Sequence, residues 1–401
     1  MILLLAVACG VAVADVYFPQ AISPLVAADL AISPGSAALV ATAAQLGYAA
    51  GIFLLVPLGD RVPHRPLLVT LLVLTCGGLL IAGAAPSLAV LVAASAATGA
   101  TTVVPQIVIP MAVGLTAPDR RGAVTGTLLS GLIGGILLAR TFSGTVGAWL
   151  GWRAPYLVAA GVVLVLALVL AAKVPVTTPP SRQRYPALLA ESLRLLRSEP
   201  ELRRSCFYQA TVFAGFSAAW TSVALFVTGP AYGMGAPVVG LIALVGAGSM
   251  FCTPVAGRRV DRSGPEPVSL VCLLGAVLSA VVLLGGLARG ALGLVALAAG
   301  LLLLDIAMQA GQVANQARIF VLRPEARSRL NTAYMTCAFL GGSVGSWLGV
   351  RAYRSLGWAG VCTLVAVAAV LALLRHLLRA GGQVAVTADR PEPAAPTPAA
   401  R

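Results

Sequence analysis

Residues 152–172 read WRAPYLVAAGVVLVLALVLAA, and this stretch decides what kind of protein the chain can form. After Arg153 it carries no charged side chain for 19 residues, and a helix needs about 20 apolar residues to cross the hydrocarbon of a bilayer. Eleven more apolar runs occupy residues 2–27, 36–58, 66–85, 88–115, 122–149, 205–229, 236–256, 267–288, 291–317, 330–350 and 358–375. The pattern predicts twelve membrane-spanning helices.

The composition of the whole chain points to the same class of protein. Of its 401 residues 59% are hydrophobic and 10% are charged, whereas soluble domains are about 45–50% apolar and about 25% charged. A soluble enzyme, a disordered chain and an outer-membrane barrel with alternating strands are therefore excluded. The net charge of +14 comes from arginines in short loops, so it predicts membrane topology rather than a nucleic-acid partner.

The sequence also lacks the residue patterns of catalytic, metal and nucleotide sites. The seven cysteines form no CxxC pair, and only two histidines occur, so we expect packing cysteines and no metal site. No GxxxxGK[ST], GxSxG or HExxH motif is present. We therefore expect no enzyme activity, no cofactor and no use of ATP, which leaves the proton gradient as the energy source.

The distribution of basic residues predicts the orientation. The loops after even-numbered helices and the C-terminal end hold 22 of the 27 Lys and Arg residues, and the opposite side holds four. Positive charge accumulates on the cytoplasmic side, so both termini are expected in the cytoplasm of a bacterial cell. The domains expected are a bundle at 1–172, a linker with a basic amphipathic helix at 173–204, a bundle at 205–380 and a disordered tail at 381–401. The linker helix is predicted to lie on the inner leaflet.

Three landmarks repeat at about half the chain length. Asp60-Arg61 recurs as Asp261-Arg262 at an offset of 201, and Gly151-Trp152 recurs as Gly357-Trp358 at an offset of 206. The loop at 118–122 matches 324–328, also at 206. A competing match of 144–151 with 342–349 lies at 198. The landmarks predict two parallel repeats of six helices, as in many transporters.

These residues resemble the major facilitator superfamily, and more narrowly its twelve-helix drug/metabolite:proton efflux branch. The superfamily pattern G-x-x-x-D-[RK]-x-G-[RK]-[RK] is kept in part by Asp60, Arg61 and Arg65. Its second copy holds Gly257, Asp261, Arg262 and Gly264. Marks of a bacterial efflux subgroup lie at 17–20, 45–48, 216–221, 304–305, 315–316 and 327–335. The resemblance implies an all-α integral membrane fold, with 12 transmembrane helices in two pseudo-symmetric six-helix bundles.

The resemblance also implies a gate, and it has one departure. It places Asp60 near the start of helix 11 and Asp261 near the start of helix 5, where free N–H groups favour a carboxylate. The alternative is a loop turn whose arginines only set topology. Many antiporters of this branch carry an arginine in helix 4 that is implicated in proton coupling. Residues 91–101 contain none, so that proton route does not transfer.

Asp305 is the most informative residue of the predicted spans. It lies near the middle of its run, where a carboxylate is costly and usually functional. Gln309, Gln312 and Gln316 fall with it within an arc of about 60° on one helical face. Gln106 corresponds to Gln312 at the 206-residue offset, so the two are expected to face each other. The stripe lines a wet cavity or, alternatively, locks helices together by hydrogen bonds.

Two more charges and several side chains complete the candidate pathway. Asp15 and Arg140 either pair in the outer half of the membrane, or Arg140 reaches the outer headgroups while Asp15 lies at a cavity mouth. Gln20 and Trp220 are candidates for lining the pathway, since aromatic rings in transporter cavities stack on ligands. The alternative for Trp220 is ordinary core packing.

The function expected from these features is secondary transport by alternating access. The chain would export a small organic molecule in exchange for protons, with Asp305 as the proton carrier because a low dielectric favours a neutral carboxylate. Uptake is the alternative direction, and a non-transporting sensor or scaffold is disfavoured by the two gate motifs. The partners expected are the substrate and the lipid bilayer, with the protein acting as a monomer.

Overall fold

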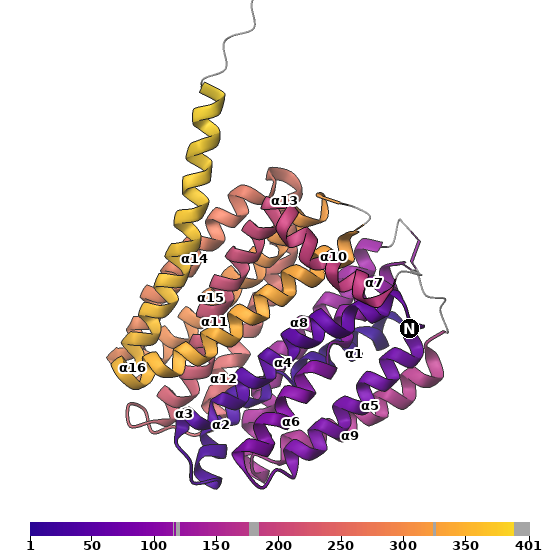
Figure 1. Cartoon of the computed structure of the whole chain (residues 1–401). Helices are drawn as coiled ribbons and strands as arrows, with labels where there is room; N and C mark the ends of the chain where they lie inside the picture. Colours follow the sequence, from indigo (N-terminus) through magenta and orange to yellow (C-terminus); the bar gives the residue numbers. More distant parts are fainter. Residues whose placement is uncertain (115, 118–120, 176–183, 324–325, 389–401) are drawn as a thin grey trace, which may run out of the picture.

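The computed structural model describes residues 1–401 except 115, 118–120, 176–183, 324–325 and 389–401. The described part is built from helices, and the first half of the chain lies beside the second (Figure 1). The first half holds α1 (Ile2–Ala14), α2 (Phe18–Asp29), α3 (Pro34–Ala37), α4 (Leu39–Leu55), η1 (Val56–Asp60), α5 (His64–Gly83), α6 (Leu88–Thr101), α7 (Val104–Gly114), α8 (Arg121–Leu150) and α9 (Ala154–Lys173). After α10 (Tyr185–Ser198) come α11 (Pro200–Thr228), α12 (Ala236–Gly246), η3 (Ala247–Phe251), α13 (Cys252–Ser263), α14 (Pro265–Leu284), η4 (Gly285–Ala288), α15 (Gly290–Phe320) and α16 (Arg327–Ala388).

Eleven helical stretches of the described residues are long and apolar enough to cross a membrane. The last of them, residues 327–379, has 53 residues and would be about 80 Å long if straight, against about 30 Å of hydrocarbon. Gly357 interrupts it with a φ of +62°, and the ribbon of α16 reverses direction near its label (Figure 1). The membrane-protein class is therefore confirmed, and the count of twelve stays a prediction.

The repeated Gly-Trp pair adopts the same backbone conformation in both halves. Gly151 has a φ of +84° and Gly357 a φ of +62°, a region that glycine enters without steric cost. The tryptophan after each glycine is buried: Trp152 donates to Asp29 Oδ2 at 2.9 Å, and Trp358 donates to the carbonyl of Leu283 at 2.8 Å. The competing offset of 198 would pair Gly151 with Gly349, which has no positive φ. The structure thus supports the offset of 206.

Several expected runs are divided by breaks that hydropathy did not reveal. The run 2–27 becomes α1 and α2, separated at residues 15–17, and Pro19 lies in the first turn of α2. Proline has no N–H to bond the carbonyl four residues earlier and its ring clashes with that carbonyl, so the helix cannot continue unbroken from α1. The run 88–115 is divided into α6 and α7 before Pro105. The run 236–256 extends through α13 to Ser263. The second gate motif was expected in a loop, and most of it is helical.

The linker and the tail follow from the remaining helices. The predicted amphipathic helix is present as α10, but Leu188 and Leu195 on its apolar face are buried against protein. Its neighbours are α11, α16 and η1, whereas Leu193 of the same helix is 49% exposed, and its position on the inner leaflet stays a prediction. Residues 381–388 continue α16 as helix, and the disorder of the tail at 381–401 stays a prediction. Residues 389–401 lie outside the described part.

In three pairs of helices, the two backbones contact each other directly, without side chains between them. A Cβ at Gly135 of α8 would lie 2.1 Å from the carbonyl oxygen of Gly10 in α1. A Cβ at Gly345 of α16 would lie equally close, 2.1 Å, to the carbonyl oxygen of Ala214 in α11. A Cβ at Gly51 of α4 would lie 2.1 Å from the carbonyl oxygen of Ala100 in α6. Small residues allow such approach inside membranes. The α1–α8 and α11–α16 contacts occupy corresponding places in the two halves.

Gly135→Val should therefore destabilise the protein, because its side chain would meet the backbone of α1. We expect a loss of about 1–3 kcal/mol or more, measured as a lower melting temperature and a smaller monodisperse fraction in detergent. Gly134→Val is the matched control, since a Cβ at Gly134 meets nothing within 4 Å. Equal melting temperatures for the two variants would contradict the α1–α8 contact.

The orientation can be tested by cysteine labelling in a background without the native cysteines. Arg194→Cys on α10 should react with a membrane-impermeant maleimide only in inside-out vesicles. Pro230→Cys, in the connection between α11 and α12, should react only in intact cells. Both original side chains are exposed. Labelling of both positions from one side would show that α11 does not cross the membrane.

Candidate functional site

Arg140 and Asp305 meet across the indole ring of Trp220 between the two halves. Trp220 of α11 donates its indole N–H to Oδ1 of Asp305 on α15, at 3.0 Å. The guanidinium carbon of Arg140, on α8, lies 4.1 Å from the centre of the Trp220 ring. The three side chains are at most 1% exposed. Arg140 and Asp305 attract each other without forming a direct ion pair, so the ring separates two opposite buried charges.

The Arg140 guanidinium is held by aromatic rings more than by hydrogen bonds. Its Nε donates to Oε1 of Gln20, at 2.8 Å. The Tyr17 and Phe216 ring centres lie 5.0 Å and 5.4 Å from its guanidinium carbon, and a cation desolvated over a ring gains about 2 kcal/mol. Its Nη1 and Nη2 atoms have no hydrogen-bond partner among the described residues. Two donors therefore remain free in a buried place.

The second oxygen of Asp305 has a closely fitted space. Asp305 Oδ2 has no hydrogen-bond partner in the described part of the chain. It points at Gly246, where α12 ends: a Cβ added at Gly246 would lie 2.5 Å from it. Only glycine leaves room for the carboxylate in this position. The arrangement accommodates a proton on Oδ2 without displacing the bond from Trp220 to Oδ1.

Asp15 is placed apart from this cluster. It follows the last residue of α1, is 3% exposed, and neither carboxylate oxygen has a hydrogen-bond partner within the described ranges. Arg140 is fully buried rather than directed to the headgroups, and it bonds Gln20 rather than Asp15. Neither of the two arrangements considered for Asp15 and Arg140 is therefore found.

The glutamine stripe leads from Asp305 into a small cavity between the halves. Gln309 and Gln312 of α15 line it together with Gln106 of α7 and Tyr48 of α4. Its volume is about 30 Å³, and a cavity needs about 10–15 Å³ on this measure to hold one water molecule. Gln106 and Gln312 thus face one cavity, although Gln312 bonds Gln209 at 3.5 Å. No small organic molecule fits until the halves move apart.

A chain of amides closes the cavity on one side and joins the halves. Gln316 donates to Asn331 Oδ1 at 3.3 Å, and Asn331 donates to Gln106 Oε1 at 3.4 Å. Gln106 in turn donates to the Tyr48 hydroxyl at 3.4 Å. Gln316 and Asn331 belong to the second half, and Gln106 and Tyr48 to the first. These bonds are long, so the connection is one that domain motion can break.

Asp60 lies beside the first turn of α16. It ends η1, is within electrostatic range of Arg329 and Glu191, and η1 contacts α16 and α10. Arg329 also forms an ion pair of 3.1 Å with Glu191 of α10. Of the other motif residues, Arg61 is exposed and Arg65 is half-buried.

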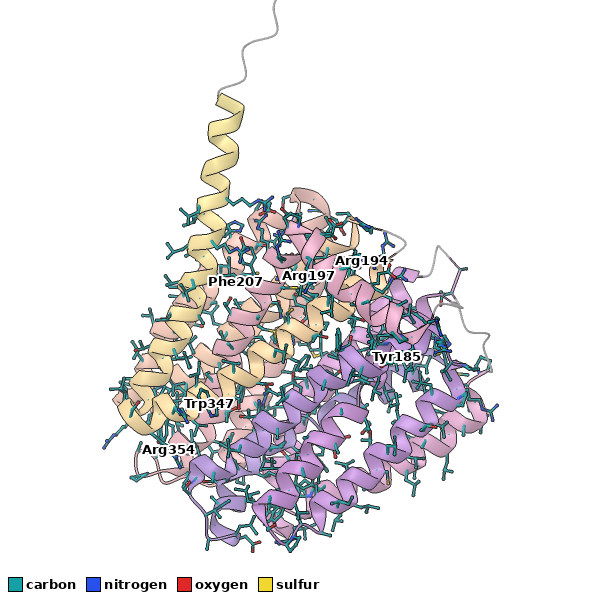
Figure 2. All side chains as sticks on the ribbon, viewed as in Figure 1. Tyr185, Arg194, Arg197, Phe207, Trp347 and Arg354 are labelled. Atoms are coloured by element: carbon teal, nitrogen blue, oxygen red, sulfur yellow. The ribbon has the colours of Figure 1, made fainter. Side chains whose placement is uncertain are left out.

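The linker helix α10 reaches the first half as well. The Tyr185 hydroxyl donates to the carbonyl of Leu54, near the end of α4, at 2.5 Å. Figure 2 labels Tyr185 on this helix, far from Arg354 and Trp347 at the other end of the molecule. Through Tyr185 and Glu191, α10 bridges the two halves at the end where Asp60 lies.

The second copy of the motif is arranged differently. Asp261 is exposed on α13 and has no hydrogen bond or ion pair with a described residue. Asp261 was expected near the start of helix 5, which is α8. Residues 118–120 directly before α8 are outside the described part, so the structure describes that region only in part. Gly257 has open space around it, and Gly264 ends α13 with a φ of +79°. The two motif copies are thus not equivalent in this conformation.

At the opposite end of the molecule, α16 contacts α3 and α4. Arg354 donates to the Ser33 hydroxyl at 2.6 Å, and its guanidinium occupies the place that a Cβ of Gly35 would take. Thr42 donates to Ser346 at 3.0 Å. A cavity of about 180 Å³ remains between these elements, lined among others by Gly35, Thr42 and Arg354.

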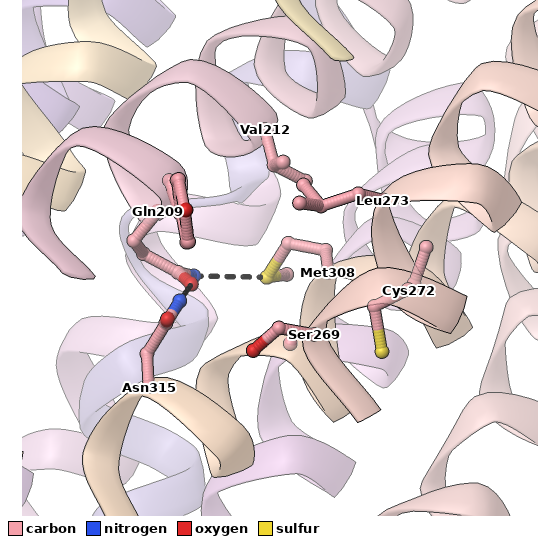
Figure 3. A pocket seen from close by; sticks show the side chains of 10 residues that line it. Gln209, Val212, Ser269, Cys272, Leu273, Met308 and Asn315 are labelled. Atoms are coloured by element: carbon pink, nitrogen blue, oxygen red, sulfur yellow. Dashed lines mark hydrogen bonds between the residues drawn. The ribbon is translucent and has the colours of Figure 1, made fainter. Parts of the chain in front are cut away.

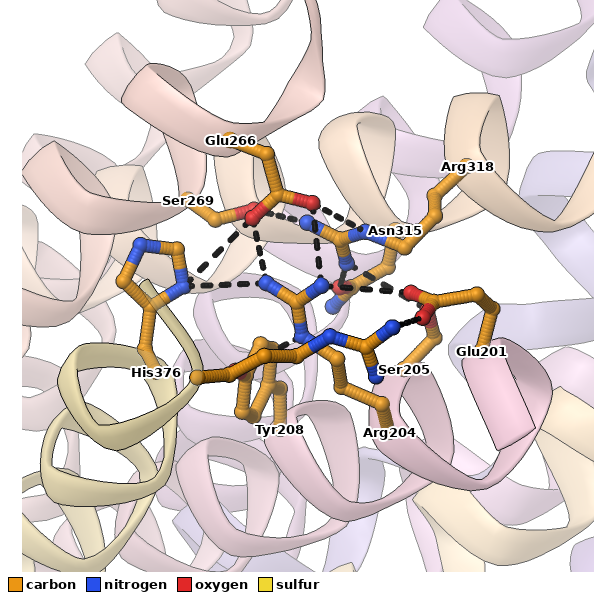
Figure 4. Close-up of polar contacts among 10 residues, drawn as sticks. Glu201, Arg204, Ser205, Tyr208, Glu266, Ser269, Asn315, Arg318 and His376 are labelled. Atoms are coloured by element: carbon orange, nitrogen blue, oxygen red, sulfur yellow. Dashed lines mark hydrogen bonds and ion pairs between the residues drawn. The ribbon is translucent and has the colours of Figure 1, made fainter. Parts of the chain in front are cut away.

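A charged cluster in the second half was not recognised in the sequence. Glu266, at the start of α14, accepts from Arg204 of α11 at 3.0 Å and from Arg318 of α15 at 3.2 Å. His376 of α16 lies 3.8 Å from the same carboxylate, and Arg204 pairs with Glu201 at 3.1 Å (Figure 4). Four helices are fastened together at one end. The available signal was that Arg204 and Arg318 directly adjoin the apolar runs 205–229 and 291–317.

Beside this cluster, a polar network surrounds Gln209 on α11. Its Oε1 accepts from the Tyr334 hydroxyl at 2.8 Å and from Asn315 at 3.3 Å, and Asn315 accepts from Arg318 at 2.8 Å. The space next to it holds only about 10 Å³ and is also lined by Met308 and Ser269 (Figure 3). Asn315 therefore joins the charged cluster to the central amides.

Comparisons with known proteins agree with this architecture. The chain is 38% identical over 376 residues to the uncharacterized transporter YgaY of Escherichia coli O157:H7, covering 93% of this chain and 94% of that one. It is 27% identical over 257 residues to the chloramphenicol resistance protein of Streptomyces lividans, covering 64% of each. A bacterial homologue of the human lysosomal transporter Spinster, in an inward-facing and occupied conformation, shares the fold with a TM-score of 0.64, 15% identity and 98% coverage of both chains.

The family follows from the extent of the sequence match and from the fold. The sequence model of the Major Facilitator Superfamily matches residues 3–284, and the YgaY relative extends the similarity over most of the chain. The chain belongs to the major facilitator superfamily of transporters.

Proposed function

We propose that this transporter is a proton-coupled exporter of a small organic molecule in the bacterial cytoplasmic membrane. The observation that carries the proposal is the buried contact of Arg140, Trp220 and Asp305 between the two halves. A charge in the middle of a membrane is costly, by about 2.5–3.5 kcal/mol on insertion scales. Its retention at a moving interface is expected of a group that changes protonation during transport.

The two halves hold different parts of this site, and that links protonation to motion. Arg140, Gln20 and Tyr17 belong to the first half, whereas Asp305, Trp220 and Gly246 belong to the second. An ionised Asp305 attracts Arg140 and favours the closed interface. Protonation removes that attraction, so the halves separate more easily and the carboxyl group is exposed to one side. Rocking of two halves around a central site is the usual mode of such transporters.

The substrate is proposed to bind among the amides of the stripe once the cavity opens. Gln309, Gln312 and Gln106 present donors and acceptors to a shared space, which suits a small polar organic molecule. Export is favoured over uptake because one relative is a chloramphenicol resistance protein. A static sensor is disfavoured, since the halves are joined by long bonds such as Asn331 to Gln106.

The test is transport by the purified protein in proteoliposomes. Metabolite levels in deletion and overexpression strains identify the compound, and its flux is then followed under an imposed pH gradient. Concentration of the compound against its gradient, driven by protons moving the opposite way, supports the proposal. Flux that is unaffected by the pH gradient contradicts proton coupling.

Asp305→Asn should uncouple transport from the proton gradient. The amide keeps the size of the side chain and removes the titrating group, so we expect counterflow exchange to persist while proton-driven accumulation falls at least tenfold. Both activities are measured in the same proteoliposomes. Asp15→Asn is the matched control for loss of a buried carboxylate. Accumulation that persists in Asp305→Asn and disappears in Asp15→Asn would assign the proton to Asp15.

Asp60→Asn should leave the protein inserted and strongly reduce flux. The neutral amide loses its attraction to Arg329 and to the start of α16, worth about 0.3–2 kcal/mol depending on burial. Membrane expression and substrate flux are measured together. Arg61→Gln, which removes an exposed charge next to Asp60, is the control. Normal flux in Asp60→Asn would show that the residue only shapes the turn.

A further inference from the structure

A lateral groove of about 660 Å³ lies between α13, α14 and α15. Its walls are hydrocarbon side chains such as Val255, Val271 and Leu303, and its floor is formed by small residues, among them Gly275 and Ala310. Ligand sites for small molecules measure about 300–1,000 Å³. The groove is separate from the central cavity, whose lining residues come from other faces of the helices.

The groove opens toward the surrounding lipid. Val255 is 55% exposed and Val271 is 68% exposed, although both are apolar and lie within candidate membrane spans. From Cys252 to Arg259 the groove follows α13 for about 10 Å, compared with about 15 Å for one leaflet of the hydrocarbon. An apolar groove of this depth is suited to an acyl chain rather than to water.

One end of the groove carries two arginines without an acidic partner. Arg259 and Arg262 line it at the C-terminal end of α13, and neither forms an ion pair with a described residue. Two acids lie nearby. Asp261, the single acid on α13, forms no ion pair with a described residue. Glu266 is already bonded to Arg204 and Arg318. The positive-inside rule predicts that this end faces the cytoplasm.

We propose that this groove binds an anionic phospholipid of the cytoplasmic leaflet. One acyl chain lies along α13 and α14, and the phosphate contacts Arg259 and Arg262. The hydrocarbon walls would accept the chain of any lipid, whereas the two arginines select a headgroup of net negative charge. Basic pockets between membrane helices on the cytoplasmic side are known to hold such headgroups. The proposal does not depend on the substrate or direction of transport.

Native mass spectrometry of the full chain in detergent tests this site. The protein is titrated with phosphatidylglycerol and with phosphatidylcholine of the same acyl chains. We expect tighter binding of phosphatidylglycerol, and a loss of about fivefold in its affinity for each arginine removed, thus about 25-fold in the Arg259→Ala/Arg262→Ala variant. Arg258→Ala is the matched control, because Arg258 is exposed on the same turn of α13 and does not line the groove.

A second variant separates the acyl chain from the headgroup. Gly275→Leu should fill the groove while folding normally, because a Cβ at Gly275 only reaches ordinary contact distance, 3.7 Å, from the Cβ of Ala307. It should weaken phosphatidylglycerol binding although both arginines remain. Equal affinity for the two lipids, an unchanged affinity in the double arginine variant, or binding of glycerol 3-phosphate alone as tight as that of the lipid would overturn the proposal.

Discussion

The hydrocarbon of a bilayer offers no water to a charge, and the rest of this structure is arranged around that constraint. Asp305 and Arg140 are both buried, and the indole ring of Trp220 stabilises both of them. Its N–H donates to Asp305, and its face lies against the guanidinium of Arg140. Helix α12 ends at Gly246, which lies opposite the free carboxylate oxygen of Asp305. Helix α11, which presents Trp220, is buried over several consecutive residues, since it must contact both halves. The charge pair therefore determines which residues its neighbours can be.

Hydropathy and spacing predicted the features that depend on one helix at a time. The apolar runs located the spans, because bilayer thickness sets their length. The stripe of Asp305 and its glutamines was visible because helical periodicity alone places them on one face. The repeated Gly-Trp pair identified the halves, since glycine is the residue that best tolerates the left-handed turn found at Gly151 and Gly357.

The features that hydropathy missed depend on contacts between helices. Long arginine side chains reach several ångströms in any direction, so the sequence could not tell that Arg140 lies over Trp220 or that Arg204 and Arg318 share Glu266. The breaks between α1 and α2 and between α6 and α7 occur inside apolar runs, where only Pro19 and Pro105 mark them. Likewise, the amphipathic pattern of α10 suits contact with lipid and with protein alike, so the sequence could not tell that Leu188 and Leu195 pack against protein.

The docking of α10 has a consequence for the order in which bonds break. This helix is fixed to the first half by Tyr185 and to the second half by Glu191. The two halves cannot separate at this end unless one of those attachments is released. Glu191 and Asp60 both interact with Arg329, so the release of Glu191 weakens the attachment to the second half, whereas the release of Tyr185 frees the first half. The weaker of the two attachments breaks first, and the linker then moves with the half to which it is still attached.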